Sequence, residues 1–204
     1  GPRFSIIHGA PYDRAKTSMR AFDLCGDCQT EYENPLDRRY HAQPVACHMC
    51  GPKAWIEKLG QGIVNCEAFS MLDDVDAVGG MLKSGEIVAI KGLGGFHLAC
   101  DATNSASVEK LRERKQRKDK AFALMARDIE AISAFAHITA EEEALLRSSA
   151  APIVLLEARR DAHLPDAVAP GLNRLGFMLP YTPLHHIMLK RMTRPIVMTS
   201  GNIS

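Results

Sequence analysis

The sequence lacks long apolar runs. None approaches the roughly 18 residues that a membrane-spanning helix needs, and the longest candidates, residues 87–90 and 153–156, have the length of a strand. The first residues also lack the long apolar region of a signal peptide. These two absences predict a cytoplasmic protein with no membrane partner.

The sequence also has little net charge. Its 25 lysines and arginines nearly balance 24 aspartates and glutamates, which leaves a formal charge of +1. No overall positive field therefore favours nucleic acid as a partner, and any basic site must be local. The length of 204 residues and the 46% of hydrophobic residues are typical of a globular protein with one or two domains.

Four of the six cysteines form two Cys-x-x-Cys pairs, with 18 residues between the pairs. The pairs are Cys25 with Cys28 and Cys47 with Cys50. In a reducing compartment such pairs favour a metal ion over disulfides, and four thiolates complete the tetrahedral shell of one zinc ion. No position stays open for a substrate, so we expect a structural zinc site. Two disulfides or a redox-active pair are the alternatives.

Two histidines lie close to these cysteines in the sequence. His41 and His48 could replace a thiolate as ligands, but four thiolates already fill the shell. We therefore expect both histidines at the surface or just outside the ligand shell. A small, loop-rich segment buries little apolar area, so metal binding would supply much of its folding energy.

From about residue 67 the apolar spacing alternates between helical and extended periods. Helices are expected at 71–84, after a cap at Asn104 or Ser105, from the capping box at Thr139 through 147, and near 184–191. Strands are expected at 86–91, 121–125, 153–157, 176–179 and 196–199. This order predicts an α/β (α+β) domain with a mixed, twisted sheet.

Three local segments of this domain could bind a ligand. The first is the glycine-rich stretch 91–97, and the second is the basic run 112–120, with six positive residues in nine. The third is Thr-Ser-Gly-Asn at 199–202, at the end of an expected strand. Glycines allow close backbone approach, cations neutralise phosphate, and hydroxyl and amide groups bind phosphate or sugar oxygens. The plainer interpretations are a tight turn, a solvated helix face and a second turn.

The order and wording of several motifs resemble one known family. The motifs are Pro-Tyr-Asp-Arg at 11–14, the two cysteine pairs, Pro-Leu-Asp-Arg-Arg-Tyr-His-Ala-Gln-Pro-Val-Ala-Cys at 35–47, and Ile-Val-Ala-Ile-Lys-Gly-Leu-Gly-Gly-Phe-His-Leu-Ala-Cys-Asp at 87–101. Together they resemble the HypF family of hydrogenase-maturation carbamoyltransferases over essentially the whole chain. The resemblance implies a small four-cysteine zinc-finger module at 1–60, the second of that family, and a YrdC-like domain at 61–204 that is truncated at its C-terminus.

The resemblance also implies an activity. Such proteins use ATP and carbamoyl phosphate, hydrolysed to carbamate by a separate acylphosphatase-like domain, to form carbamoyl adenylate in the YrdC-like domain. A further domain passes the carbamoyl group to the C-terminal cysteine of a HypE-type partner, where it becomes the cyanide ligand of a nickel–iron hydrogenase. The implied cofactors are a structural zinc ion and ATP with Mg²⁺, and no protein nucleophile is required.

By the same resemblance, seven residues are expected to bind the nucleotide and its phosphates. They are Lys91, His97, Lys115, Arg117, Lys120, Ser200 and Asn202. The two remaining cysteines, Cys66 and Cys100, have no base or partner assigned by their spacing, and we expect them to be buried hydrophobic residues.

Two positions depart from the pattern of the family and its relatives. Ala121 stands where the family usually has proline, and Met178 stands where tRNA-modifying YrdC relatives have an arginine for the carboxylate of threonine. The second departure disfavours a module that forms threonylcarbamoyl adenylate for tRNA. That function and a simple RNA-binding module remain the alternatives.

Overall fold

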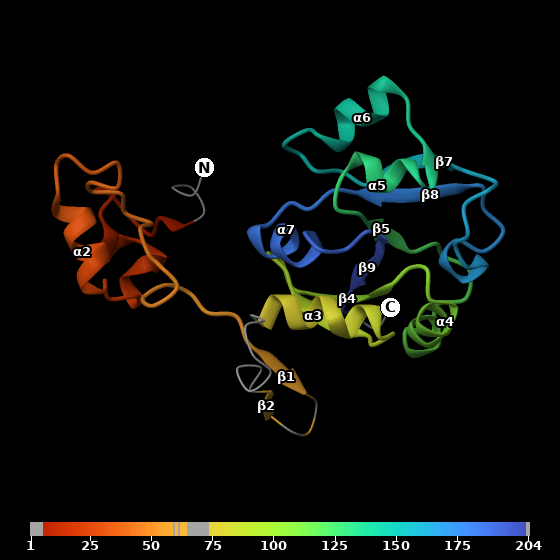
Figure 1. Cartoon of the computed structure of the whole chain (residues 1–204), viewed down its shortest axis with the longest axis horizontal. Helices are drawn as coiled ribbons and strands as arrows, with labels where there is room; N and C mark the ends of the chain where they lie inside the picture. The colour runs from red at the N-terminus through yellow and green to blue at the C-terminus, as the bar shows by residue number, and fades with distance from the viewer. Residues whose placement is uncertain (1–5, 59, 61, 65–73, 203–204) are drawn as a thin grey trace. The chain divides into compact units, whose positions relative to one another are not determined.

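The computed structural model describes residues 6–58, 60, 62–64 and 74–202 (Figure 1). The chain forms two compact units, Gly1–Trp55 and Ile56–Ser204, so the units divide before residue 60, where the sequence placed the boundary. Within the described part, no helix is both long and apolar enough to cross a membrane. Each unit is described by itself.

The N-terminal unit consists of short helices joined by loops. They are η1 (Arg14–Lys16), η2 (Ser18–Ala21) and α2 (Gly26–Glu33). The guanidinium of Arg14 ties the loops together, because it donates to the carbonyl oxygens of Phe22, Gln43 and Val45 at 2.7 to 2.9 Å. Few apolar side chains are buried in this unit, so polar contacts and the cysteines must hold it together.

The second unit opens with a hairpin and continues with a seven-stranded sheet. The hairpin pairs β1 (Ile56–Lys58) with β2 (Gly62–Val64). In spatial order the sheet strands are β3 (Val88–Lys91), β4 (Phe96–Asp101), β9 (Ile196–Ser200), β5 (Ala123–Met125), β8 (Arg174–Met178), β7 (Val154–Ala158) and β6 (Ala136–His137). The pair β5–β8 is parallel and the other sheet pairs are antiparallel, so the predicted mixed sheet is confirmed.

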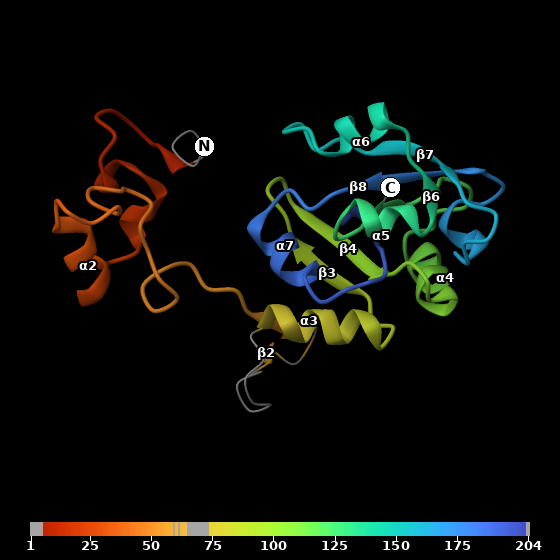
Figure 2. The ribbon, with the colours of Figure 1, turned by 45° about the horizontal axis from the view of Figure 1, so that its top comes forward.

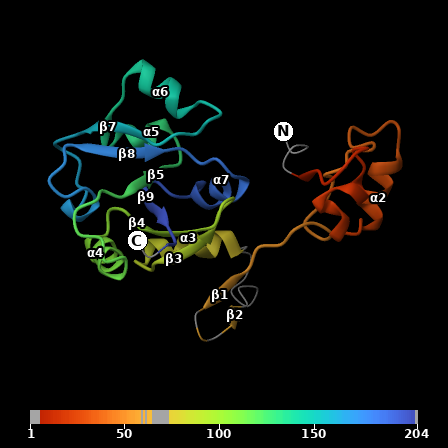
Figure 3. The same ribbon diagram turned by 180° about the vertical axis from the view of Figure 1, so that it is seen from behind.

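Helices cover both faces of this sheet (Figures 2 and 3). They are α3 (Asp74–Lys83), α4 (Ser105–Arg114), α5 (Ile129–Ser133), α6 (Ala140–Leu146), η4 (Asp166–Val168) and α7 (Pro183–Leu189). Neighbouring strand residues point to opposite faces. Leu124 therefore packs into a core that includes Leu111 of α4, whereas Met125 packs into a core that includes Leu82 of α3 and Leu189 of α7.

Most predicted elements are present, with ends shifted by a few residues. The capping box at Thr139 and the cap at Asn104 are also observed. Of the predicted helix 71–84, residues 74–83 are helical, and residues 71–73 and Cys66 lie outside the described residues. Strand β4 was missed, because it directly follows Gly94-Gly95 and its Phe-His-Leu-Ala-Cys-Asp sequence does not alternate between apolar and polar residues.

Candidate functional site

The four cysteines of the N-terminal unit form one cluster. Their sulfur atoms all lie within 4.8 Å of one another, and Cys47 Sγ is 3.6 Å from Cys25 Sγ and 3.8 Å from Cys50 Sγ. A tetrahedron of sulfurs at about 2.3 Å from a central ion has edges of about 3.8 Å. The cluster therefore has the size of a tetrahedral zinc site.

The electrostatics of the cluster also fit a cation. Burial, together with hydrogen bonds to Cys50, Cys25 and Cys47, raises the pKa of Cys28 to about 12. Backbone N–H groups near Cys25 and Cys47 lower the pKa of Cys50 to about 6. The protein alone therefore stabilises the thiolate form of some of the cysteines but not of all four. A bound Zn²⁺ would stabilise the thiolate form of the others.

The four cysteines form the ligand set, and the two nearby histidines are not part of it. His41 and His48 are both exposed, as predicted, and His41 stacks on the ring of Tyr32 at a centroid distance of 5.2 Å. The backbone turns sharply after the second pair, where Gly51 N–H donates to the Cys47 carbonyl at 2.7 Å. A Cβ atom at Gly51 would lie 2.7 Å from that oxygen, so the turn requires glycine.

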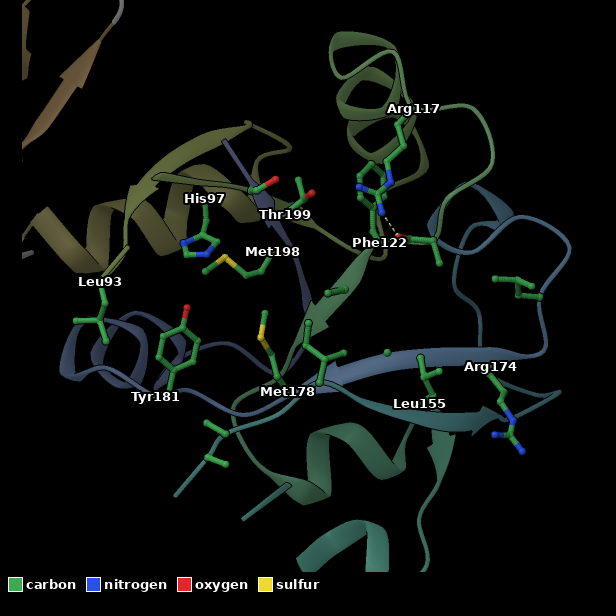
Figure 4. A pocket seen from close by; sticks show the side chains of 18 of the residues that line it. Leu93, His97, Arg117, Phe122, Leu155, Arg174, Met178, Tyr181, Met198 and Thr199 are labelled. Carbon is green, nitrogen blue, oxygen red and sulfur yellow. Dashed lines mark hydrogen bonds between the residues drawn. The ribbon is translucent and has the colours of Figure 1, made fainter. Parts of the chain in front are cut away.

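The second unit carries a cavity of about 1040 Å³ over one face of the sheet (Figure 4). Its wall includes Arg117, Thr199, Ser200 and His97. Much of the remaining wall is apolar. In Figure 4, Met178, Met198, Tyr181 and His97 surround one end, and Leu155 and Arg174 lie at the other.

Strand pairing places the glycine-rich segment beside the end of β9. His97 of β4 is paired with Ser200, and the Phe96 carbonyl accepts a hydrogen bond of 2.7 Å from the Gly201 N–H. A Cβ atom at Gly201 would lie 2.9 Å from this carbonyl. Glycine between Ser200 and Asn202 therefore lets the backbone of this turn approach β4 closely.

Lys115 joins the basic loop (residues 115–120) to the turn at residues 200–202. Its side chain is 2% exposed, and Nζ donates to the carbonyl oxygens of Ser200 at 2.7 Å and Asn202 at 2.6 Å. Burial, followed by the nearby charge of Arg117, lowers the pKa of Lys115. An ammonium group has three N–H donors, so one remains after these two bonds.

A defined helix end separates Lys115 from Arg117. The Arg117 N–H donates to the Arg112 carbonyl and the Gln116 N–H to the Glu113 carbonyl, and Gln116 has a φ of +51°. This is the Schellman arrangement, in which the chain leaves a helix through one left-handed residue. The reversal at Gln116 directs Lys115 into the interior and Arg117 to the cavity wall.

The guanidinium of Arg117 is partly engaged by its own loop. Nε donates to the Lys120 carbonyl at 2.9 Å and Nη2 to the Ala121 carbonyl at 2.5 Å, and the group lies 5.1 Å from the centre of the Phe122 ring. A guanidinium has five N–H donors, so three remain for an anion in the cavity.

The sheet beneath the other end of the cavity is bare and apolar. Ile153, Leu155 and Leu172 are 53%, 60% and 56% exposed, although all three line the cavity. Between them, Gly176 is paired with Leu155 across β7 and β8 and adds no side chain. Large apolar side chains that are this exposed within a concave wall favour a flat apolar ligand group.

Two histidines near the Tyr181 end of the cavity have ring nitrogens without a hydrogen-bond partner among the described residues. His185 of α7 is fully buried, and neither of its ring nitrogens has a hydrogen-bond partner among the described residues. Burial, followed by repulsion from His97 and His186, lowers the pKa of His185 to about 4. His97 also has a buried, unpartnered Nδ1, and its ring lies against Gly92. The imidazole of His185 therefore lies in a dry environment, whereas His97 is half-buried and lines the cavity.

Known proteins match this chain in both units. The Sua5_yciO_yrdC family model, described as "Telomere recombination", matches residues 80–204 and so more than half of the chain. The chain belongs to the Sua5/YciO/YrdC family. A second model, "HypF finger", matches residues 24–57, which include all four cysteines of the cluster.

The relatives that match the whole chain include HypF proteins, the family that the sequence motifs suggested. Carbamoyltransferase HypF of Rhodobacter capsulatus is 52% identical over all 204 residues. A crystal structure of full-length HypF in its phosphate- and nucleotide-bound form is 48% identical over the whole chain, with a TM-score of 0.82. In each case the chain spans 26% of the relative's length. The resemblance to HypF is therefore confirmed.

A more distant family member shows the extent of the shared fold. P. abyssi Sua5, solved in complex with L-threonine, covers 64% of this chain at a TM-score of 0.56 and 21% identity. At this identity the likeness shows the Sua5/YciO/YrdC fold alone.

The seven residues predicted to bind a nucleotide take different places in this Sua5/YciO/YrdC domain. His97, Arg117 and Ser200 line the cavity, and Lys115 is buried outside the wall and donates to the Ser200 carbonyl. Asn202 contributes its carbonyl to Lys115, and its side chain is not part of the cavity wall. Two further residues, Lys91 and Lys120, are exposed outside the wall.

Several wall residues had no distinctive signal in the sequence. Tyr181 lies three residues after the end of β8, and Arg174 begins this strand, so both positions depend on which strands neighbour β8. Ile153, Leu155 and Leu172 read as ordinary core residues, because apolar periodicity does not distinguish a buried face from a cavity wall.

Proposed function

We propose that this chain is the zinc-finger and YrdC-like part of a HypF-type carbamoyltransferase, and that its cavity binds ATP and carbamate and forms carbamoyl adenylate. The observation that carries the proposal is that Arg117 and Ser200 face one cavity whose remaining wall is largely apolar. A nucleotide is complementary to both parts of this wall, because it has an anionic phosphate chain and a flat base.

The apolar end of the cavity suits the adenine ring. Ile153, Leu155 and Leu172 present exposed aliphatic surface, and Gly176 leaves the sheet flat between them. Burying a base against these side chains removes their apolar area from water, which stabilises the complex. Arg174 at this end could contact the ribose or a phosphate oxygen.

The part of the wall around Arg117 suits the phosphates. Three N–H groups of Arg117 remain after its bonds to Lys120 and Ala121, and they can bind phosphate oxygens in the cavity. The hydroxyls of Thr199 and Ser200 add donors at the end of β9. Lys115 acts here by fixing the Ser200–Asn202 turn and by its positive charge. Mg²⁺ bound to the departing phosphates would neutralise part of their charge.

In the proposed reaction an oxygen of carbamate attacks the α-phosphorus of ATP. A new P–O bond forms, the bond to the β-phosphate oxygen breaks, and pyrophosphate leaves with the electron pair, so carbamoyl adenylate remains. The protein supplies position and charge rather than a nucleophile, because the reactants themselves hold the reacting groups. The Met178–Tyr181–Met198 end of the cavity would exclude water from the small acyl group.

The zinc-finger unit has a structural role in this proposal. Four thiolates leave no open coordination position on a Zn²⁺ ion, so the metal would stabilise the unit without activating a substrate. In the complete protein the carbamoyl group would pass to a HypE-type acceptor and serve synthesis of the hydrogenase cyanide ligand.

Exchange of labelled pyrophosphate into ATP tests the proposed reaction. With Mg²⁺ and carbamate, or carbamoyl phosphate in the complete protein, exchange should require the carbamoyl source and fall at least 10-fold in Arg117→Met. The matched Arg114→Met variant removes an exposed arginine of the same helix end and should retain exchange. Exchange that instead requires L-threonine and bicarbonate would support the tRNA-modification alternative. No exchange with either substrate, in the chain and in the complete protein, would contradict the proposal.

A further inference from the structure

The guanidinium of Arg112 contacts three carbonyl groups of the loop at residues 115–120. Nη1 donates to the carbonyl oxygens of Arg117 at 2.9 Å and Lys118 at 3.0 Å, and the Lys120 carbonyl oxygen lies 3.3 Å from both Nη1 and Nη2. On its other edge, Nε and Nη2 donate to the Ala167 carbonyl at 2.9 and 2.5 Å. One guanidinium thus binds the loop and the η4 segment together.

This arrangement depends on the shape of the arginine head group. A planar guanidinium offers five N–H donors over two edges, whereas an ammonium group offers three donors from one point. Ordering a loop costs backbone entropy at every residue, so this loop needs such hydrogen bonds to stay fixed. A lysine at position 112 could satisfy only part of the loop.

Arg112 and Arg117 share two contact groups. Both guanidinium groups lie over the Phe122 ring, at 4.7 and 5.1 Å from its centre, and both donate to the Lys120 carbonyl. Only Arg117 of the pair lines the cavity. The position of Arg117 therefore depends on a ring and a carbonyl that Arg112 also holds.

We propose that Arg112 is a positioning residue that orders the 115–120 loop and holds Arg117 at the cavity wall without contacting the ligand. The inference rests on the proposed function in one respect, that Arg117 binds the phosphates of a nucleotide. The role of Arg112 goes beyond the proposed function, because Arg112 lies outside the cavity wall.

Titration with ATP and with adenosine separates positioning from general folding. In Arg112→Lys and Arg112→Ala, ATP should bind at least 10-fold more weakly, while adenosine, which has no phosphate, should bind within about 2-fold of wild type. Millimolar methylguanidinium should restore part of the ATP affinity of Arg112→Ala. The control variants Arg114→Lys and Arg114→Ala should match wild type, because Arg114 is exposed on the same helix.

Hydrogen exchange gives a readout that needs no ligand. The amides of residues 116–120 should exchange faster in Arg112→Ala than in Arg114→Ala, with the sheet amides unchanged. Unchanged exchange, unchanged ATP affinity, or equal losses for ATP and adenosine would each overturn the role of Arg112. A wild-type chain that binds no ATP would instead contradict the proposed function, and the exchange experiment would still decide whether Arg112 orders the loop.

Discussion

The ammonium group of Lys115 donates a hydrogen bond of 2.7 Å to the carbonyl oxygen of Ser200, 85 residues further along the chain. The same group binds the Asn202 carbonyl at 2.6 Å. The two sequence segments that the HypF resemblance paired are thus joined by backbone carbonyls and one buried cation. In this arrangement Lys115 shapes the turn that carries Ser200 to the cavity.

Replacing Lys115 by methionine should destabilise the second unit. The apolar stem is retained, but the carbonyl groups of Ser200 and Asn202 lose a charged donor, and a hydrogen bond to a charged group contributes roughly 1.5–3 kcal/mol. Urea unfolding followed by circular dichroism should show a lower midpoint with an unchanged m-value. Lys118→Met, at an exposed position of the same loop, is the control. Equal midpoints for both variants would contradict this role of Lys115.

Gln116 should be replaceable by glycine with a gain in stability. Its φ of +51° lies in the left-handed region, which glycine adopts without the steric cost of a side chain. Gln116→Gly should raise the free energy of unfolding by about 0.5–1 kcal/mol, measured by thermal denaturation. Lys110→Gly, inside the same helix, should lower it by about 1 kcal/mol. A loss of stability in Gln116→Gly would show that the helix end differs from the Schellman arrangement.

Burial of His185 should make the second unit sensitive to acid. A folded-state pKa of about 4 lies below the ordinary value of 6.5, so the unfolded chain binds more protons between these values. Stability should therefore be complete above pH 6.5 and fall as the pH drops toward 4, by up to about 3 kcal/mol from this group.

His185→Leu tests that dependence, because it removes the titrating group and keeps an apolar side chain at the buried position. The slope of unfolding free energy against pH between 6.5 and 4 should flatten in His185→Leu. It should flatten much less in His186→Gln, which removes only the smallest of the causes that lower this pKa and whose position is exposed. The same slope in wild type and His185→Leu would contradict a neutral, dry imidazole at this position.

Removal of metal should unfold the N-terminal unit selectively. We expect one zinc ion per chain by elemental analysis, much less in Cys28→Ser, and full content in Cys100→Ala, since Cys100 lies outside the cluster. The single tryptophan, Trp55, is the last residue of this unit, so a chelator should change its fluorescence while the circular dichroism of the sheet persists. Zinc content that is equal in Cys28→Ser and wild type would exclude the four-cysteine site.

Local patterns in the sequence predicted the parts of this molecule that depend on nearby residues. The spacing of Cys25, Cys28, Cys47 and Cys50 was sufficient to predict a cluster, because each pair shares one short turn. The capping box at Thr139 likewise depends only on a residue three positions away.

Contacts between distant segments could not be predicted in the same way. Lys115 looked like a free phosphate-binding cation, and its carbonyl partners became visible only when β4, β9 and α4 were placed together. Arg112 looked like one more charge on a solvated helix face, since nothing in the run 112–120 shows which guanidinium turns toward the loop carbonyls. The strand order of the sheet decides these contacts, and apolar periodicity carries no information about strand order.

Isothermal titration of ATP into the wild-type chain and Arg117→Met is the most direct test of a nucleotide site in the cavity. We predict one ATP site in the wild type, at least 10-fold weaker binding in Arg117→Met, and unchanged binding in Arg114→Met, which differs only in the position of the lost charge. A wild-type chain that gives no binding heat, or an Arg117→Met variant that binds ATP as tightly as the wild type, would contradict this prediction.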